Sequence, residues 1–288
     1  MKRISLLLPT RGRPDEAARF LKSVAETTTS PEHVEIIIYV DEDDATSHNI
    51  GHDDLSIKRI IGPRRTMGYY NSECLAQSTG AVIVLVNDDM VIRTRGWDEM
   101  VRKLDMSVPD NIYLAYGNDM LKKSRLCTFP ILSRRTCEVL QEPYHHAYRG
   151  AFIDYHLMDI FKRLEYAGYP RIFYLDDLVF EHLHHRSGKA PMDTTYRERK
   201  RFADDMVFIS LAEERKASLM LLWSEVKGNL TTGPSTLPAY IDMPRPLPWR
   251  APFQFGRIFL ADGQLPPKWR FFLWWWFCAR NIVSFMEK

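Results

Sequence analysis

The chain has 288 residues, of which 45% are apolar, and its 39 lysines and arginines nearly balance 37 acids, for a net charge of +2. A charge so close to zero argues against a large polyanionic partner such as a nucleic acid. The length suits one large domain with an appendage, whose core needs neither disulfides nor a structural metal. Four cysteines without a CxxC pair or zinc-like spacing favour a reducing compartment, so we expect a cytoplasmic protein.

The first predicted element is a strand at residues 4–8 that ends at Pro9, and helical spacing follows over residues 15–26. The apolar run is too short for a signal peptide, and no small-residue cleavage site follows it. The connecting loop, PTRGRP, carries Arg11 and Arg13 where cations and a backbone turn can meet an anionic ligand. Solvated turn arginines explain the same pattern equally well.

Acids follow the second predicted strand, residues 34–40, in a run that begins at Asp41. A third strand at residues 57–61 precedes Arg64 and Arg65. An acidic run after a strand is often only a solvated turn with a helix cap. Because acids recur after a later strand, we favour a shared polar crevice at the ends of the strands.

The chain is centred on the stretch AVIVLVNDDM at residues 81–90, which is preceded by a predicted helix at residues 67–77. Six apolar residues without interruption are typical of a strand buried on both faces of a parallel sheet. The strand runs into Asn87, Asp88 and Asp89, where the ligand crevice of an open α/β sheet lies. Their oxygens suit Mg²⁺ or Mn²⁺ bound with phosphate, although they also suit a turn or a helix cap.

Strands that alternate with helices in this way predict an α/β fold with a Rossmann-like, mostly parallel central sheet flanked by helices. A later helix over residues 152–164 carries Asp154 and Asp159, and Asp154 at its start can point into the crevice. Two further strand-like runs follow at residues 172–175 and 178–185.

The second of these runs places His182 and His184 on one face of an extended segment. Two imidazoles near a carboxylate crevice can bind a divalent metal or donate to a phosphate, but a polar surface is also consistent with them. Lys189 lies in the polar stretch RSGKAPMD that follows. It can close over a diphosphate as a point charge, or it can be an ordinary exposed lysine.

The last third of the chain has a different character. Residues 195–229 are helical in pattern with a break near Ser210, and residues 231–252 are rich in proline. The Trp-rich tail from residue 268 is too short to span a bilayer, so it either contacts a membrane interface or docks on its own domain or on a twin subunit. We therefore predict a catalytic domain at 1–192, a helical segment at 193–230, and a connector with a C-terminal helix at 231–288.

Three motifs together resemble the family 2 glycosyltransferases, which have the GT-A fold. ISLLLPTRGRP looks like the first strand and loop of that family, IIIYVDEDD like its nucleotide-binding strand, and TMGYYNSECLAQSTGAVIVLVNDDM like its helix, strand and DxD block. The resemblance covers roughly residues 3–190. Asn87 stands where the first acid of the DxD motif would be, and an asparagine oxygen can still coordinate a hard cation.

The resemblance implies a role for each matching residue. Asp41 looks like the acid that reads the nucleobase, and Asp89 like the principal metal ligand. Asp154 matches the catalytic base of inverting members, with Asp159 as a competitor. The remaining matches are to the nucleotide pocket (Pro9, Thr10, Arg11, Arg64, Arg65, Asp88), to the metal and diphosphate (Asn87, His182, His184), and to the loop over the donor (Lys189).

The expected function is a metal-assisted glycosyltransferase that uses Mn²⁺ or Mg²⁺ and a nucleotide-diphosphate sugar, with a UDP-sugar favoured. The acceptor is a glycan, a lipid-linked molecule or another hydroxyl compound. Two alternatives are a nucleotidyltransferase, which the missing glycine-rich phosphate loop disfavours, and a binding or assembly protein that has lost catalysis. We expect a cytoplasmic enzyme that contacts the inner face of a membrane, or forms a homodimer, through the Trp-rich helix.

Overall fold

The computed structural model describes residues 1–183, 188, 200–228 and 236–287. The strands are β1 (Ile4–Thr10), β2 (Val34–Asp41), β3 (Ser56–Gly62), β4 (Val82–Leu85), β5 (Met90–Ile92), β6 (Leu114–Asn118), β7 (Ile131–Ser133) and β8 (Ile172–His182). The α-helices are α1 (Pro14–Thr27), α2 (Met67–Gln77), α3 (Trp97–Ser107), α4 (Arg134–Leu140), α5 (Ile153–Tyr166), α7 (Asp205–Ser210), α8 (Ala212–Val226), α9 (Ala251–Phe255) and α10 (Pro267–Met286).

The strands of the described residues form one sheet in the order β3-β2-β1-β4-β7-β6-β8-β5. All neighbours pair in parallel except at β7, which is antiparallel to both β4 and β6, and at β5, which is antiparallel to β8. The predicted mostly parallel sheet is therefore confirmed. Its parallel strands direct their carboxyl ends to one edge, so the loops after β1, β2 and β4 meet there.

One strand prediction is wrong in its details. The two expected runs at residues 172–175 and 178–185 are a single strand, β8, which ends at His182. A register shift in its pairing with β6 accommodates the acidic pair between the runs, because Gly117 pairs with Leu175 while Asn118 pairs with Val179. The extra residues bulge out of the ladder instead of ending it.

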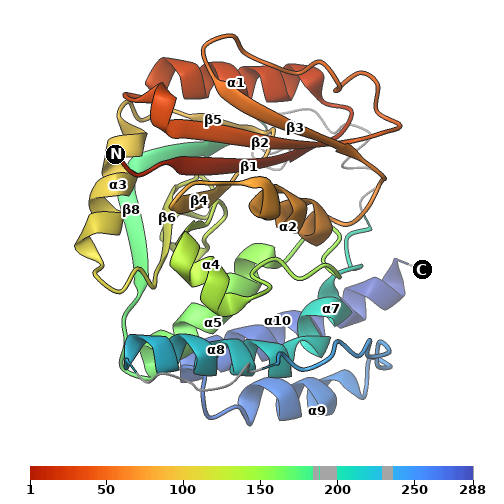
Figure 1. The fold of residues 1–288 in the computed structure, drawn as a ribbon. Coiled ribbons are helices and arrows are strands. Elements are labelled where there is room, and N and C mark those ends of the chain that lie inside the picture. Colours follow the sequence, from red (N-terminus) through yellow and green to blue (C-terminus); the bar gives the residue numbers. More distant parts are fainter. Residues whose placement is uncertain (184–187, 189–199, 229–235, 288) are drawn as a thin grey trace.

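Helices cover both faces of the sheet (Figure 1). On one face α1 and α3 bury an apolar cluster with β1 and β2, and α1 contributes Phe20, Leu21 and Val24 at helical spacing. On the other face α2, α4 and α5 cover the sheet, and α7, α8, α9 and α10 extend the same core beyond α5. The C-terminal helices thus complete a core that begins at the sheet.

Aromatic side chains join the Trp-rich helix α10 to the start of α5. The rings of Tyr155 and Trp276 lie 4.7 Å apart, and Phe277 lies 5.6 Å from Phe152 and 5.2 Å from Phe208. One face of α10 therefore docks on its own chain. No helix in the described part of the chain is long and apolar enough to cross a membrane.

A buried ion cluster fastens the same region together. The Asp159 carboxylate on α5 accepts hydrogen bonds from Arg163 Nε at 3.0 Å, from Arg215 Nε of α8 at 2.8 Å, and from Trp269 Nε1 of α10 at 2.8 Å. Arg163 also bonds Asp262 at 2.7 Å. Burial alone would raise the pKa of Asp159, but the two arginines outweigh it and lower that pKa.

Replacing Asp159 should destabilise the fold strongly, because it leaves two buried arginines without their shared carboxylate. We expect Asp159→Ala to lower the free energy of unfolding by about 3–5 kcal/mol, measured by urea denaturation. Glu165 lies on the same helix but is exposed, so Glu165→Ala should change stability by no more than about 0.5 kcal/mol. Equal effects of the two substitutions would show that the cluster does not hold these helices together.

Candidate active site

Asp88 lies at the turn between β4 and β5 and is held by the loop after β1. Thr10 Oγ1 donates to its carboxylate at 2.9 Å, and Arg13 Nη1 donates at 3.0 Å. Burial raises the pKa of Asp88 to about 6, although Arg13 opposes that shift. The acid and the arginine thus fix the first loop against the central strand.

A second cation from the same loop reaches the acids at the end of β2. Arg11 Nη1 lies 2.6 Å from Asp41 Oδ2 and also contacts Asp43. The backbone N–H of Gly12 donates to Asp44 at 2.6 Å, and Gly12 has a positive φ of 63°. The turn after β1 therefore lies against the acidic turn after β2, while the shared crevice expected at the acid-bearing strand ends stays a prediction.

Asp41 is almost fully buried, and tyrosines line its surroundings. Tyr70 on α2 donates its hydroxyl to Asp41 Oδ1 at 2.6 Å, so the carboxylate accepts from both Tyr70 and Arg11. The rings of Tyr39 and Tyr70 lie 4.5 Å apart, and burial raises the pKa of Tyr39 to about 12. Each oxygen of the Asp41 carboxylate therefore already accepts a hydrogen bond.

Arg64 and Arg65 are exposed in the segment between β3 and α2. The guanidinium of Arg65 lies 6.0 Å from the centre of the Tyr69 ring, and its backbone N–H donates to Tyr70 at 2.7 Å. This segment therefore touches the tyrosine that bonds Asp41. Both arginines thus lie in an exposed segment next to the tyrosines around Asp41, and their role at a nucleotide stays a prediction.

Asp89 and His182 form the candidate metal centre. Asp89 Oδ2 lies 3.2 Å from Nε2 of His182, which comes from the last residue of β8. The backbone fixes this contact, since Leu183 N–H donates to Asp89 O at 2.8 Å. His184 and Lys189 lie outside the described residues. Asn87 lies in the turn just before Asp88 and is partly exposed.

The donor set of this centre fits a divalent ion that is shared with a substrate. Within the described residues, no three histidine, cysteine or acidic side chains are arranged to hold a metal by themselves. One carboxylate and one imidazole can supply part of a coordination shell, and Mg²⁺ and related ions commonly complete theirs with phosphate and water. The residues present therefore suit a metal brought in with a diphosphate.

Asp154 is half-buried in the first turn of α5, where a carboxylate is stabilised by the helix N-terminus. Its Oδ1 accepts from Tyr155 N–H at 2.8 Å, and its carbonyl accepts from Cys127 Sγ at 3.1 Å. The loop that holds Cys127 leads back to Asp119, whose carbonyl accepts from His182 N–H at 3.1 Å. The loop of residues 119–128 therefore connects the Asp154 turn to the metal centre.

Asp159 does not share this position. Its side chain is fully buried, and both of its oxygens accept bonds from Arg163, Arg215 and Trp269. A carboxylate enclosed in this way cannot receive a proton from a substrate hydroxyl. This geometry favours Asp154 over Asp159 as the candidate base, and the assignment stays a prediction. A spacing of five residues separates it from Asp154 on the helix surface.

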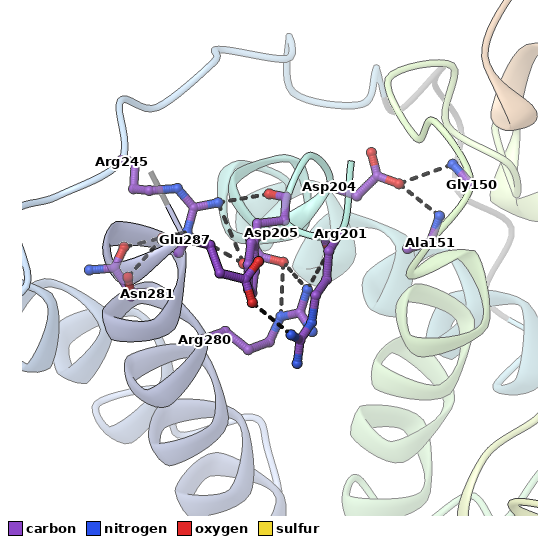
Figure 2. A network of polar contacts seen from close by, with 11 residues as sticks. Gly150, Ala151, Arg201, Asp204, Asp205, Arg245, Arg280, Asn281 and Glu287 are labelled. Atoms are coloured by element: carbon purple, nitrogen blue, oxygen red, sulfur yellow. Dashed lines mark hydrogen bonds and ion pairs between the residues drawn. The ribbon is translucent and has the colours of Figure 1, made fainter. Parts of the chain in front are cut away.

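The start of α5 is held in place by Asp204, just before α7. Asp204 accepts from the backbone N–H groups of Arg149, Gly150 and Ala151 at 2.7–3.0 Å. Figure 2 shows this carboxylate reaching the turn. Phe152, the next residue, has a positive φ of 70°, which is uncommon for an aromatic residue. The clamp thus fixes a strained turn two residues before Asp154.

The adjacent Asp205 ties the same region to α10. It pairs with Arg280 at 2.7 Å and with Arg245 at 3.4 Å, as Figure 2 shows. The guanidinium of Arg280 also lies 5.2 Å from the centre of the Phe152 ring. Asp204 and Asp205 therefore link the C-terminal helix to the turn that carries Asp154.

Sequence reasoning missed several residues that organise the site. The loop sequence indicates a cation at Arg13 but not its pairing with Asp88, and the pattern of the helix at residues 67–77 indicates no role for Tyr70. Asp119 and Asp204 each accept several backbone N–H groups. For Asp119 and Asp204, the available signal was an aspartate at a loop position, which is too common to indicate a role.

Comparison with solved structures shows which fold this is. A mannosyltransferase from Pyrobaculum calidifontis, PcManGT, in complex with GDP-Man and Mn²⁺, matches with a TM-score of 0.53 at 13% identity, over 98% of this chain and 86% of that chain. The chain has the GT-A fold. S. aureus TarS matches with a TM-score of 0.50 at 12% identity, over 98% of this chain and 53% of TarS. No family model and no curated protein sequence matches this chain.

The Asp204 clamp predicts a local effect at the start of α5. Asp204→Ala should lower the free energy of unfolding by about 1–3 kcal/mol, because three partly buried backbone N–H groups lose their acceptor. Amide hydrogen exchange should become faster in peptides covering residues 149–156. Asp53→Ala, at an exposed acid, is the control and should leave both measurements unchanged. Unchanged exchange at residues 149–156 in Asp204→Ala would rule out the clamp.

Proposed function

We propose that this protein is a glycosyltransferase that moves a sugar from a nucleotide-diphosphate donor to an acceptor hydroxyl, with inversion at the anomeric carbon. The observation that carries the proposal is the set of acids at one sheet edge. Asp41 and Asp88 are paired with loop arginines, and the Asp89–His182 pair lies beside them. The GT-A fold, shared with a mannosyltransferase in complex with GDP-Man and Mn²⁺, supports the same reading.

The donor nucleotide is proposed to lie over the loops after β1 and β2. Pro9, Thr10 and Arg11 line the proposed nucleotide pocket. Asp41 reads the base, which replaces the hydrogen bond that Asp41 accepts from Arg11 or from Tyr70. Arg64 and Arg65 approach the phosphates from the rim. A UDP-sugar is our first candidate, and the GDP-mannose of the similar mannosyltransferase makes GDP-sugars the second.

Asp89 and His182 would hold Mn²⁺ or Mg²⁺, with Asn87 and His184 as proposed additional ligands. When bound, such an ion stabilises the negative charge that develops on the departing diphosphate. Asp88, with its buried partner Arg13, keeps the turn that carries Asp89 in place. Lys189 is proposed to add positive charge near the same leaving group.

Asp154 is proposed to act as the general base. Its carboxylate takes the proton of the acceptor hydroxyl while that oxygen attacks the anomeric carbon. The new carbon–oxygen bond forms as the bond to the diphosphate oxygen breaks, and the electron pair leaves with the nucleoside diphosphate. The acceptor class is a glycan, a lipid-linked molecule or another hydroxyl compound, and the enzyme is proposed to act in the cytoplasm.

The donor site predicts a selective nucleotide response. In a thermal-shift panel of UDP, GDP, CDP and dTDP, each with Mn²⁺ or with EDTA, one nucleotide should stabilise the protein and EDTA should weaken that effect. Ligand at a hundred times its dissociation constant adds about 2.7 kcal/mol. A complete absence of response to every nucleotide would argue for the alternative of a binding protein without a donor site.

Substitutions should separate the metal centre from the base. Asp89→Asn should abolish turnover and weaken nucleotide and Mn²⁺ binding, measured by calorimetry. Asp154→Asn should lower kcat by about 10²–10⁴-fold and leave nucleotide binding unchanged. Asp177→Asn, at an exposed acid of β8, is the matched control and should retain full activity. A near-normal kcat of the Asp154→Asn variant would show that another group takes the proton of the acceptor hydroxyl.

A further inference from the structure

The C-terminal segment exposes an unusual share of large apolar side chains. Among the described residues, ten of the sixteen exposed large apolar side chains lie between residues 241 and 286. Several of them form one stripe on α10. Phe271, Trp275, Ile282 and Met286 lie within an arc of about 60° around the helix axis. Phe271 and Trp275 are each 58% exposed.

A neighbouring helical segment exposes side chains of the same kind. Helix α9 continues into the π-helical turn η4 (Gly256–Leu260), and both pack against α10. Trp274 Nε1 donates to Pro252 O at 2.9 Å across this contact. Phe253 and Leu260 are exposed on this segment. We call these residues and the α10 stripe the C-terminal apolar face (Phe253, Leu260, Phe271, Trp275, Ile282, Met286).

The charges around the C-terminal apolar face are mostly positive. Between residues 241 and 287 the sequence has six basic residues and three acids, Asp242, Asp262 and Glu287, and Glu287 pairs with Arg201. Asp262 is buried and pairs with Arg163, and Asp205 pairs with two of the basic residues. The other four have no carboxylate partner in the part of the chain that the structure describes, namely Arg250, Arg257, Lys268 and Arg270.

The exposed apolar side chains and the positive charges help to distinguish between two binding partners of the C-terminal apolar face, a second copy of the chain and a lipid surface. A two-fold dimer would bring the same patch of each copy together, so the four cations without a carboxylate partner would meet the same excess of positive charge on the other copy. An anionic lipid surface instead offers headgroup phosphates to the cations and an apolar layer to the aromatic rings. Tryptophan is enriched at this depth of a bilayer. Charge and exposure therefore both favour a membrane surface.

We propose that the C-terminal apolar face binds the surface of an anionic lipid bilayer without crossing it. Phe271 and Trp275 enter the interface, and Lys268, Arg250 and Arg257 contact the headgroups. Helix α10 thus has two faces with separate tasks, since its opposite face carries Trp276 and Phe277 into the core. This proposal goes beyond the proposed enzymatic activity and does not depend on it.

The test is co-sedimentation of the full chain with vesicles of phosphatidylcholine alone, or of phosphatidylcholine mixed with phosphatidylglycerol. We expect binding to the mixed vesicles that weakens at high salt. Lys268→Gln and Arg257→Gln should each lower the partition coefficient by about five-fold at low salt, because each cation near an anionic surface contributes about 1 kcal/mol to the binding free energy. Phe271→Ser combined with Trp275→Ser should lower it further.

Matched controls come from α3, on the other face of the sheet. Met106 and Lys103 are exposed there, so Met106→Ser and Lys103→Gln should leave binding unchanged. Circular dichroism checks that each variant folds.

Absence of wild-type binding to anionic vesicles, or full binding by the Phe271→Ser/Trp275→Ser variant, overturns the proposal. A dimer in sedimentation velocity that Trp275→Ser abolishes would assign the face to a second copy. Vesicle binding needs neither donor nor acceptor, so its failure leaves the enzymatic proposal untouched.

Discussion

The burial of negative charge at one edge of the sheet is the constraint on which the site depends. Asp41, Asp88 and Asp89 have almost no exposed surface, and a carboxylate away from water needs a cation or several donors. The loop after β1 meets this need with Arg11 and Arg13, although burial still raises the pKa of Asp88. The buried acids at this edge therefore determine where the loop after β1 lies.

The sequence predicted which residues reach this edge but not how they pair. Apolar runs that end in acids identify buried parallel strands, and the parallel sheet then forces their carboxyl ends together. Pairing depends on side-chain directions across loops, which no periodicity reports. Arg13 and Arg11 lie two residues apart in PTRGRP, yet one bonds Asp88 and the other Asp41. Tyr70 reaches Asp41 from α2, a predicted helix in which the sequence singled out no site residue.

The two acids of α5 show why spacing alone misleads. Asp154 and Asp159 belong to one short segment, and either matched the expected base. Helices α8 and α10 make the difference between the two acids. They bring Arg215 and Trp269 into contact with Asp159, whereas Asp154 lies in the first turn of α5. These partners are 56 and 110 residues away in sequence. The difference between Asp154 and Asp159 therefore depends on the C-terminal third of the chain, which carries no recognisable motif.

The C-terminal helices therefore help to position the candidate site. Asp204 and Arg280 both act on the turn before Asp154, one through backbone hydrogen bonds and the other through the Phe152 ring. The sequence showed an apolar, Trp-rich helix but could not divide its residues between inside and outside, because apolar side chains occur on every face. Only the docking of α10 on Phe152, Phe208 and Phe259 separates the buried Phe277 from the exposed Trp275. Since both faces belong to one rigid helix, whatever occupies the outer face also lies close to the element that holds the candidate base.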